Sequence, residues 1–595
     1  MQNEELKSSN NKYNFVDALS IPLIINEISQ FLDKEDIKCL YLCSKKTYQI
    51  HYNQIEKLAI NEDIEPSNLS KINFDKYKNL LKLDLYHCLS IRDFSFISSL
   101  KQLVYLDISD TEISDISFLG KNKNIKELNL HECRHVKDYS IISNLKNLEK
   151  LNLGKTNVSD ISFLKNNKNI KELNLRKCSL EKDDFSIISN LKKLEILILS
   201  DNIVSDISFL KKNKNIKELF LDICEKIEDF SVISNLEKLE RLDLSYCHIS
   251  DISFLEKNKN IKELNLYQCY YHIKGYSIIS KLEKIEILHI YHANDSDISM
   301  SLKNNNTKNI KELSLSWCDE IKDYSFLLNF GKLEKLAIKK GNICNISFLK
   351  KNKDIKELIL YSCEKIKDFS VISNLEKLEK LSLENTNISD ISFLEKNKNI
   401  KELNLNRCGI RDYSIISKLE KLEIFDASWS NISDISFLEK NKNIKELKFV
   451  CSDLKHFPIM SNLEKLEIIK LNGTGISDIS FLEKTKNIKK LDLYDCICIK
   501  DFTIISNLEK LERLDLSYCH ISNISFLEKN KNIKELKLVH CTEINNFSSL
   551  YKLKKIEILN ANNTEISDND VSMIKKSNKN IRHLARRKYY DSYDD

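Results

Sequence analysis

The sequence predicts an α/β solenoid, in which short rungs stack along one axis and share a single parallel β-sheet. A segment of the form Asn-Ile-Lys-Glu-Leu returns about every 45 residues, and each period divides into two halves of 22 or 23 residues with a Leu-x-Leu core. The 595-residue chain contains only 8 Gly and 3 Pro, too few for the irregular loops of several globular domains. We therefore expect repetitive turns built on asparagine.

The two halves of each period differ in a regular way. The first-kind rung carries a cysteine after its Leu-x-Leu core, as at Cys133, and the second-kind rung carries a residue such as Thr156 there. Each kind occurs 11 times, which gives 22 rungs, and Leu58-Ala59-Ile60 forms one degenerate leading rung. The alternation points two leucines inward and the residue between them outward, as a short strand requires. Because one rung cannot bury its apolar face, neighbouring rungs must cover one another.

This pattern resembles the leucine-rich repeat consensus, L-x-x-L-x-L-x-x-(N/C)-x-L, over residues 55 to 584. The resemblance implies a horseshoe whose concave face is the parallel β-sheet and whose partners are proteins held on that face. The domain boundaries predicted from it are a flexible N-terminus at 1–15, a helical module at 16–52, the repeat solenoid at 53–584 and a charged C-terminal tail at 585–595.

The return segment of the second-kind rung, Ile-Ser-Asp-Ile-Ser-Phe-Leu, repeats an aspartate and a phenylalanine in register. We expect each aspartate to accept hydrogen bonds from nearby backbone amides and fix a tight turn. We expect the phenylalanines to stack as a spine of core aromatics and not to hold a cofactor. The aspartates are Asp115, Asp160, Asp206, Asp251, Asp390, Asp434 and Asp478, and the phenylalanines are Phe118, Phe163, Phe209, Phe254, Phe348, Phe393, Phe437, Phe481 and Phe526.

Cysteines form a column at one position of the first-kind rung. Rungs of one kind lie two strand spacings apart, roughly 9.5 Å, whereas a disulfide needs Cα atoms within about 7 Å, and zinc needs convergent side chains. The column therefore predicts a buried polar ladder against backbone groups, with no metal and no cofactor. Its members are Cys88, Cys133, Cys178, Cys224, Cys269, Cys318, Cys363, Cys408, Cys496 and Cys541.

Charge is balanced and interleaved along the chain. Lys plus Arg number 93 and Asp plus Glu 88, so neither a long nucleic-acid footprint nor a nucleic-acid partner is expected. Glutamates such as Glu127 precede the first-kind strands, and Lys150, Arg241 and Lys335 take that place in second-kind rungs, which predicts pairing of opposite charges across strands. The polar segment Met1–Tyr13 and the lack of an 18-residue apolar stretch predict a cytoplasmic or nuclear protein with no membrane partner.

The segment before the repeats shows helical spacing. Ser20 can cap a helix whose first turn contains Pro22. The run from Ile21 to Lys45 resembles the F-box, which in that family docks on the adaptor subunit of an SCF-type cullin-RING ubiquitin ligase. The resemblance assigns adaptor binding to Ile21, Pro22, Ile25, Ile28, Phe31, Leu32, Ile37, Leu40 and Cys43. The alternative is that these helices only cap the first rung, because every solenoid end needs a cover.

An aromatic cluster in the middle of the array is the candidate substrate-binding patch. Aromatic side chains anchor interfaces because they bury a large area with little loss of rotamer entropy. The same region holds the longest period, 49 residues, with its extra residues near Ser301 to Thr307. The alternative is local drift of the repeat. The patch residues are Tyr267, Tyr270, Tyr271, His289, Tyr291, His292 and Trp317.

Motifs for catalysis are missing from the sequence. It has no phosphate-cradling glycine-rich loop, no G-x-S-x-G, no H-E-x-x-H and no paired C-x-x-C. We therefore expect a non-enzymatic substrate receptor of an SCF-type ubiquitin ligase, whose partners are the adaptor and cullin complex and an unknown protein substrate. The alternative is a leucine-rich repeat scaffold or sequestering protein without a ubiquitin-ligase link.

Overall fold

The computed structural model describes residues 57–59, 77, 79–89, 91–180, 184–269, 273–293, 295–303, 307–454, 457, 463–578 and 581–587. The segments predicted as a flexible N-terminus (1–15) and an F-box-like module (16–52) lie outside the described residues, and so do all nine predicted adaptor-binding residues. Most of the predicted tail, from residue 588 onward, lies outside them as well.

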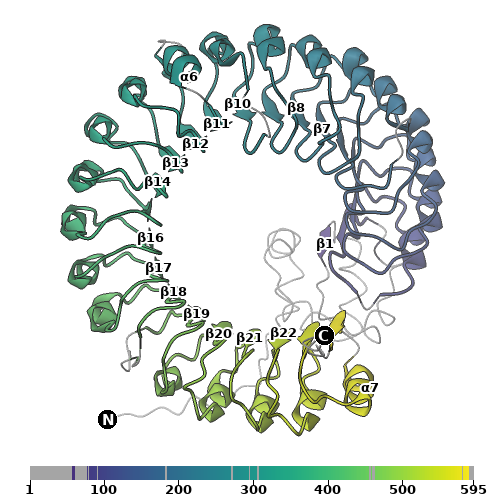
Figure 1. Cartoon of the computed structure of the whole chain (residues 1–595). Coiled ribbons are helices and arrows are strands. Elements are labelled where there is room, and N and C mark those ends of the chain that lie inside the picture. The colour runs from purple at the N-terminus through teal and green to yellow at the C-terminus, as the bar shows by residue number, and fades with distance from the viewer. Residues whose placement is uncertain are drawn as a thin grey trace, which may run out of the picture. The chain divides into compact units, whose positions relative to one another are not determined.

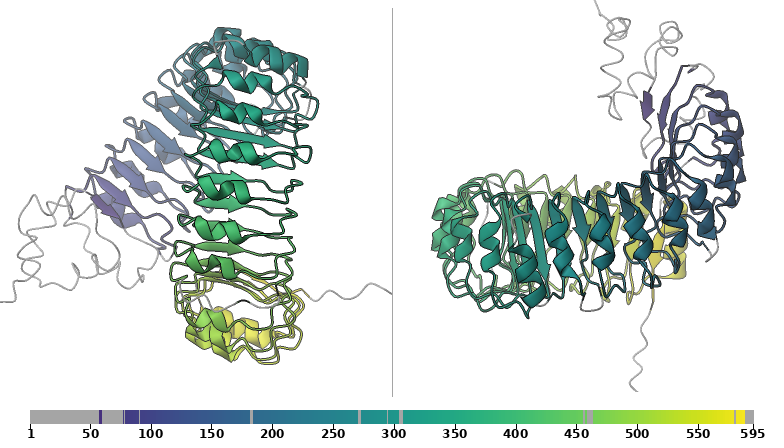
Figure 2. Two further views of the ribbon diagram at one scale, coloured as in Figure 1. Left: turned by 90° about the vertical axis from the view of Figure 1, so that its left-hand side faces the viewer. Right: turned by 90° about the horizontal axis from the view of Figure 1, so that it is seen from above.

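The predicted solenoid is confirmed. Within the described residues, 24 strands form one sheet. Consecutive strands pair in parallel and in register, so that Leu128 lies beside Leu151 and Leu151 beside Leu173. The chain divides into two compact units, Met1–Leu288 and His289–Asp595. In each unit the strands line one side and short helices the opposite side (Figure 1), and the rungs stack one on the next (Figure 2).

The first unit contains ten strands and the beginning of an eleventh. These are β1 (Lys57–Ala59), β2 (Lys82–Asp84), β3 (Tyr105–Asp107), β4 (Glu127–Asn129), β5 (Lys150–Asn152), β6 (Glu172–Asn174), β7 (Ile196–Ile198), β8 (Glu218–Phe220), β9 (Arg241–Asp243), β10 (Glu263–Asn265) and β11 (Ile287–Tyr291). Its 3-10 helices are η3 (Ser95–Ser99), η4 (Ser117–Lys121), η5 (Ser140–Asn144), η6 (Ser162–Asn166), η7 (Asp184–Asn190), η8 (Ser208–Lys212), η9 (Ser231–Asn235), η10 (Ser253–Lys257) and η11 (Tyr276–Lys281).

The second unit continues the same pattern. Its strands are β12 (Glu312–Ser316), β13 (Lys335–Lys339), β14 (Glu357–Tyr361), β15 (Lys380–Ser382), β16 (Glu402–Asn404), β17 (Ile424–Asp426), β18 (Glu446–Lys448), β19 (Ile468–Lys470), β20 (Lys490–Asp492), β21 (Arg513–Asp515), β22 (Glu535–Lys537), β23 (Ile558–Asn560) and β24 (His583–Ala585). Its helices are α6 (Asp295–Leu302), η13 (Ser325–Asn329), η14 (Ser347–Lys350), η15 (Ser370–Asn374), η16 (Ser392–Lys396), η17 (Ser414–Lys418), η18 (Ser436–Lys440), η19 (Ser480–Glu483), η20 (Thr503–Asn507), η21 (Ser525–Lys529), η22 (Ser548–Lys552) and α7 (Asp568–Ser577).

The 3-10 helices begin where the sequence predicted tight turns. Ser117 donates its backbone N–H to Asp115 Oδ1 over 2.8 Å, and the other six predicted aspartates make the same contact at 2.6 to 2.9 Å. First-kind rungs use the same device, as in the 2.8 Å bond from Ser140 N–H to Asp138. That hydrogen bond lowers the pKa of Asp138. Each carboxylate satisfies an amide that the start of a helix leaves unpaired.

Asparagines tie most second-kind rungs to the first-kind rung before them. Asn122 is fully buried, and its Nδ2 donates to the backbone oxygens of Ile97 and Leu100, both over 2.9 Å. The same double bond to the preceding rung recurs at Asn167, Asn213, Asn258, Asn397, Asn441, Asn530 and Asn578. We call this set the asparagine ladder. It confirms that the turns depend on Asn side chains.

The turn that follows each strand, in contrast, does not depend on asparagine. Almost every described rung holds one residue with a positive φ shortly after its strand. The φ of the residues that follow a strand of the sheet lies between 49° and 63°. Of these, 21 are not glycine, and only Asn385 and Asn563 are asparagines. A left-handed backbone costs most residues roughly 1–2 kcal/mol. We call this place the left-handed position, and its occupants include Tyr246, His292, Trp317, Trp429 and Tyr518.

The phenylalanine spine differs from the prediction. Phe163 stacks on Tyr139 of the preceding rung with ring centroids 6.2 Å apart, and Phe481 stacks on Phe457 at 4.1 Å. The rings thus stack in pairs that join the two kinds of rung. Only Phe348, Phe481 and Phe526 of the nine are buried, and the other six are partly exposed. The reason is that the phenylalanine follows the first residue of a 3-10 helix at the outer side of the rung.

Candidate binding surface on the strand face

The predicted patch residues fall into two groups. Tyr270 and Tyr271 lie outside the described residues. Tyr267 belongs to the first unit, where its ring meets Tyr246 edge to face with centroids 5.9 Å apart. His289, Tyr291, His292 and Trp317 belong to the second unit. The structure therefore describes the patch in two parts, and the part in the second unit holds four of the seven residues.

Three of the four side chains in the second unit form one cluster. The ring of His292 lies 4.7 Å from that of Tyr291 and 5.9 Å from that of Trp317, and Tyr291 and Trp317 are 6.5 Å apart. The fourth, His289, contacts Glu312 through its Nε2 at 3.2 Å. Trp317 is 40% exposed. The aromatic cluster that the sequence predicted at this point is therefore present in the second unit.

The strands beneath this cluster are longer than elsewhere. β12, β13 and β14 each contain five residues, whereas every strand from β15 to β24 contains three. The extra pairing brings Ser316, Lys339 and Tyr361 into one row across the sheet, next to a row formed by Ser314, Ala337 and Ile359. Small side chains therefore lie between larger ones. We call the outward-facing residues of β12–β14, together with Trp317 and Lys340, the β12–β14 surface.

Sequence reasoning missed two lysines of this surface, Lys339 and Lys340. The Lys340 ammonium lies 3.7 Å from the centroid of the Trp317 ring, which is a close cation–π contact. Lys340 occupies the left-handed position of the rung after Trp317, and Lys339 is the register partner of Ser316. The signal in the sequence was the alignment of consecutive rungs, which places residues 23 positions apart side by side.

The longest period contains α6, an α-helix in place of the usual 3-10 helix, and the Thr307 hydroxyl donates to the Leu302 carbonyl at its end over 3.2 Å. Figure 1 shows α6 on the helical side of its unit, opposite the strands. The insertion and the aromatic cluster are therefore separate features of the same rungs.

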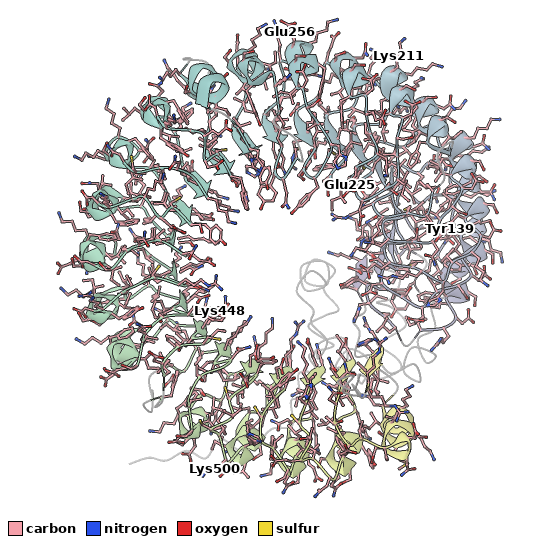
Figure 3. The ribbon with its side chains drawn as sticks, viewed as in Figure 1. Tyr139, Lys211, Glu225, Glu256, Lys448 and Lys500 are labelled. Atoms are coloured by element: carbon pink, nitrogen blue, oxygen red, sulfur yellow. The ribbon has the colours of Figure 1, made fainter. Side chains whose placement is uncertain are left out.

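Charge along the strand face is paired, as predicted. Arg241 contacts Glu218 at 3.5 Å and Glu263 at 2.7 Å, and Lys335 contacts Glu312 at 3.3 Å and Glu357 at 3.9 Å. Figure 3 shows Lys448 of β18 on the strand side of its unit, and Lys211 and Glu256 on the outer, helical side of theirs. Where the first outward position of a strand is charged, this pairing neutralises it, so selectivity must come from the positions that follow.

The first unit has an unpredicted apolar strip on its strand face. Ile196 and Ile198 of β7 and Phe220 of β8 stand where other strands carry Glu, Asn or Asp, and all three are half-buried. The Arg241 guanidinium lies 5.4 Å from the centroid of the Phe220 ring. Next to the strip, burial raises the pKa of Asp222, whose carboxylate accepts a hydrogen bond from Ser200. This strip is smaller and less exposed than the cluster around Trp317.

The cysteine column is a buried polar ladder, as predicted. Cys133 donates its thiol to the Ile108 carbonyl of the preceding rung over 3.1 Å, and seven other cysteines of the column repeat this bond at 3.0 to 3.4 Å. Burial raises the pKa of Cys133 to about 12. Among the residues that the structure describes, no group of His, Cys, Asp or Glu is arranged to hold a metal ion.

Comparison with known proteins gives one strong match. A family model described as the BspA type leucine rich repeat region matches in six copies, over residues 64–182, 154–273, 286–411, 399–469 and 470–585. A search of curated proteins gives no match.

Solved structures share the fold at low identity. The internalin InlF of Listeria monocytogenes is 23% identical, with 58% of this chain and 86% of that chain covered and a TM-score of 0.35. The functional domain of InlJ from the same organism, which includes a cysteine ladder, is 18% identical, with 65% and 77% covered and a TM-score of 0.43. TLR13 in complex with ssRNA13 is 18% identical, with 87% and 86% covered and a TM-score of 0.40.

Proposed function

The chain belongs to the BspA-type leucine-rich repeat family, and from that premise we propose that it is a substrate receptor of an SCF-type cullin-RING ubiquitin ligase. Its leucine-rich repeats form a protein-binding repeat fold. In the proposal, the strand face of the repeats captures a target protein, and the segment from Ile21 to Lys45 docks on the adaptor subunit. The chain acts by proximity, because it holds the target near the ligase and carries out no chemistry itself.

The observation that carries the binding role is the β12–β14 surface. Its exposed Trp317 packs with Tyr291 and His292 beside a row of small side chains, which is the combination of anchor and space that interface hot spots use. The link to ubiquitin rests on the F-box resemblance of residues 21–45. Within the described part of the chain, no helix is long and apolar enough to cross a membrane.

Co-purification from the native cell tests the ubiquitin link. We expect the wild-type chain to bring down an adaptor and a cullin, and the double variant Ile25→Asp with Phe31→Asp to lose both while it keeps its target protein. A matched surface variant, Lys367→Glu on an exposed turn of the repeats, should keep all three. Retention of the target by the double variant also shows that its repeats remain folded.

Direct binding of purified full-length chain to purified adaptor provides an independent measurement. Absence of adaptor and cullin from the wild-type sample, or undiminished recovery with the double variant, would overturn the ligase assignment. Either result would favour a non-enzymatic scaffold or sequestering protein, whose N-terminal helices serve only as a cap.

A further inference from the structure

We propose that the β12–β14 surface binds an extended acidic peptide segment of its partner protein. In this arrangement an aliphatic side chain of the peptide lies over Ser314 and Ala337, and a neighbouring carboxylate is held by Lys339 and Lys340. The inference rests on the proposed protein-binding function and names the chemistry of the partner. All of these residues belong to the second unit.

Shape is the first argument. Ser314 and Ala337 are register partners in the middle of β12 and β13, and neither fills the space above the sheet as Ile359 does on β14. Both are half-buried, so their surface is accessible from the strand side. The aromatic cluster and Tyr361 rise beside them. Short side chains between larger ones would leave room for a side chain of an extended peptide without any change in the backbone of the sheet.

Charge is the second argument. Lys340 places its ammonium on the Trp317 ring, and within the described part of the chain no carboxylate oxygen lies within 4.0 Å of it. Lys339 lies one position earlier and points to the strand face by alternation. The end of β13 thus carries two cations, Lys339 in the strand and Lys340 directly after it. A carboxylate is the group that complements two such ammonium groups.

The flanking charges favour a peptide over a nucleic acid. Glu312 and Glu357 lie on the first outward row, next to Ser314 and Ala337, and each is paired with Lys335. A polyanion with regularly spaced phosphates would approach these carboxylates as well as the lysines and would be repelled by them. A peptide with one acidic residue beside an aliphatic one avoids that repulsion, because only its acidic residue faces the lysines.

A buried hydroxyl without a partner is the third argument. Ser316 is 1% exposed, and among the described residues its Oγ has no hydrogen-bond partner. Buried polar groups are normally paired. Lys339 lies directly beside Ser316 in the sheet register, so movement of its side chain onto a bound carboxylate would open the hydroxyl to a backbone carbonyl of the peptide. The bound peptide would then supply the acceptor that the free protein lacks.

Trp317 itself supports a binding role. It occupies a left-handed position with φ of 55°, where glycine would be the unstrained residue. Almost every described rung holds a non-glycine residue in this conformation, so what distinguishes Trp317 is its exposed indole, a side chain that interfaces favour as an anchor. Substitution at this position therefore does not threaten the fold, which makes it a suitable site for a test.

The chain offers a built-in probe, because it contains two tryptophans, Trp317 and Trp429. Both occupy left-handed positions, and each has a cation over its ring, Lys340 at 3.7 Å and Arg407 at 5.1 Å. Trp429→Phe leaves Trp317 as the only indole, and Trp317→Phe leaves Trp429. The fluorescence of the first variant reports on the proposed site. The fluorescence of the second reports on the left-handed position after β17, a strand of three residues.

The experiment begins with selection of random short peptides on the immobilised full-length chain. We expect enrichment of peptides with Asp or Glu next to Leu, Ile or Val. Titration of a selected synthetic peptide should change the fluorescence of the Trp429→Phe variant and leave that of the Trp317→Phe variant unchanged. Lys340→Glu should weaken binding at least about tenfold, and Arg407→Glu, the matched charge reversal, should leave the affinity as it is.

Several results would overturn the inference. In the selection, these are enrichment of basic or uncharged peptides, or no enriched peptide at all. In the binding measurements, they are equal affinity of Lys340→Glu and the wild type, no change in Trp317 fluorescence, or tighter binding of single-stranded RNA than of any peptide. The proposed ligase function fails separately, through the adaptor and cullin test. Selected peptides that bind without changing the fluorescence of Trp317, and with the same affinity for the Lys340→Glu variant, would mean that the chain binds peptides at a surface other than β12–β14.

Discussion

Two stretches of the second unit, β12–β14 and β20–β22, have the same interior and different strand faces. In both, leucines fill the core, and an aromatic residue occupies a left-handed position, Trp317 in one and Tyr518 in the other. On the face of β20–β22, however, Lys537 contacts Asp515 at 3.7 Å and Glu535 at 3.2 Å. Paired charges thus fill the surface that small uncharged residues leave open in β12–β14. Inward and outward positions alternate, so the repeat frame and the binding face vary independently.

Two serines show the difference at one equivalent position. Ser517, just after β21, accepts a hydrogen bond on its Oγ from the Val539 amide of the next rung at 3.2 Å. Ser316, at the end of β12, has no such bond within the described residues. There the strands stay paired as far as Ser316 and Lys339, so the backbone ladder takes the place of the side-chain bond. Strand extension therefore explains why the Ser316 hydroxyl has no partner among the residues that the structure describes.

The largest expected effect tests the shared interior. Leu336→Ala in β13 and Leu514→Ala in β21 each remove a side chain that is 1% exposed. Both should lower the free energy of unfolding by about 2–5 kcal/mol, the cost of a cavity in a packed core. Urea denaturation measures the loss, and hydrogen exchange locates it in the substituted rung and its neighbours. A loss confined to one of the two variants would contradict the idea of a common frame.

The asparagine ladder should give the next largest effect. Asn530 of the ladder donates to Ile505 and Leu508 of the preceding rung at 2.9 and 3.0 Å. Asn352, at the equivalent position outside the ladder, donates to Leu327 of the preceding rung at 3.0 Å and to Phe348 of its own rung at 3.1 Å. Replacement of either by alanine removes two buried side-chain hydrogen bonds, while the Ile505, Leu508 and Leu327 carbonyls keep a backbone N–H partner, and we expect a loss of about 1–3 kcal/mol in each case. Faster exchange of amides in the preceding rung would confirm that the ladder couples rungs. Asn532→Ala, on an exposed turn, is the control.

Periodicity made most of this frame predictable from the sequence. The 22 predicted rungs correspond to β2–β23, and the degenerate rung at Leu58 corresponds to β1. The last strand, β24, was missed because His583-Leu584-Ala585 has only one leucine of the Leu-x-Leu pattern. The aspartate turns and the cysteine ladder were predictable for the same reason as the rungs, because each depends on contacts between residues at a constant separation.

The strand face was less predictable, because its contacts depend on how far each strand pairs. The sequence indicated the aromatic cluster at Tyr291, His292 and Trp317, since unusual residue types are visible without a structure. It gave no sign that β12–β14 extend by two residues, and so none that Ser316 would be buried without a partner. The contact between Lys340 and Trp317 joins adjacent rungs through left-handed positions, which the consensus does not specify.

The serine pair provides the sharpest comparison of the two strand faces. Ser316→Ala removes a buried hydroxyl that has no partner among the described residues, so we expect the free energy of unfolding to rise by about 1 kcal/mol. Ser517→Ala removes the acceptor of the Val539 amide and should lower it by about 1 kcal/mol. Calorimetry or urea denaturation of both variants checks the opposite signs. Effects of equal sign would show that the Ser316 hydroxyl is satisfied in solution.

The smallest expected effect is a pH dependence in the charged face of β20–β22. Burial raises the pKa of Asp515 above its ordinary value of 3.8, so the folded state favours the neutral acid. Its contribution to stability is present below the ordinary pKa and is lost as the pH rises through the folded-state pKa. Asp515→Asn should therefore increase the free energy of unfolding at pH 7, by no more than about 0.5 kcal/mol, and have no effect once the wild-type carboxyl is protonated in both states.

Asp501, in the turn between β20 and β21, supplies the control of opposite sign. Its hydrogen bonds from Thr503 lower its pKa, so its contribution is present above the ordinary pKa and is lost as the pH falls through the lower, folded-state value. Asp501→Asn should reduce stability slightly at pH 7, because the amide oxygen can still accept the Thr503 N–H but carries no charge. Unfolding curves of the two variants, measured between neutral and acid pH, should diverge from wild type in opposite directions as the pH rises. Parallel curves would mean that the contact with Lys537 offsets the effect of burial on the Asp515 carboxylate. The charged face of β20–β22 would then not lower the free energy of unfolding.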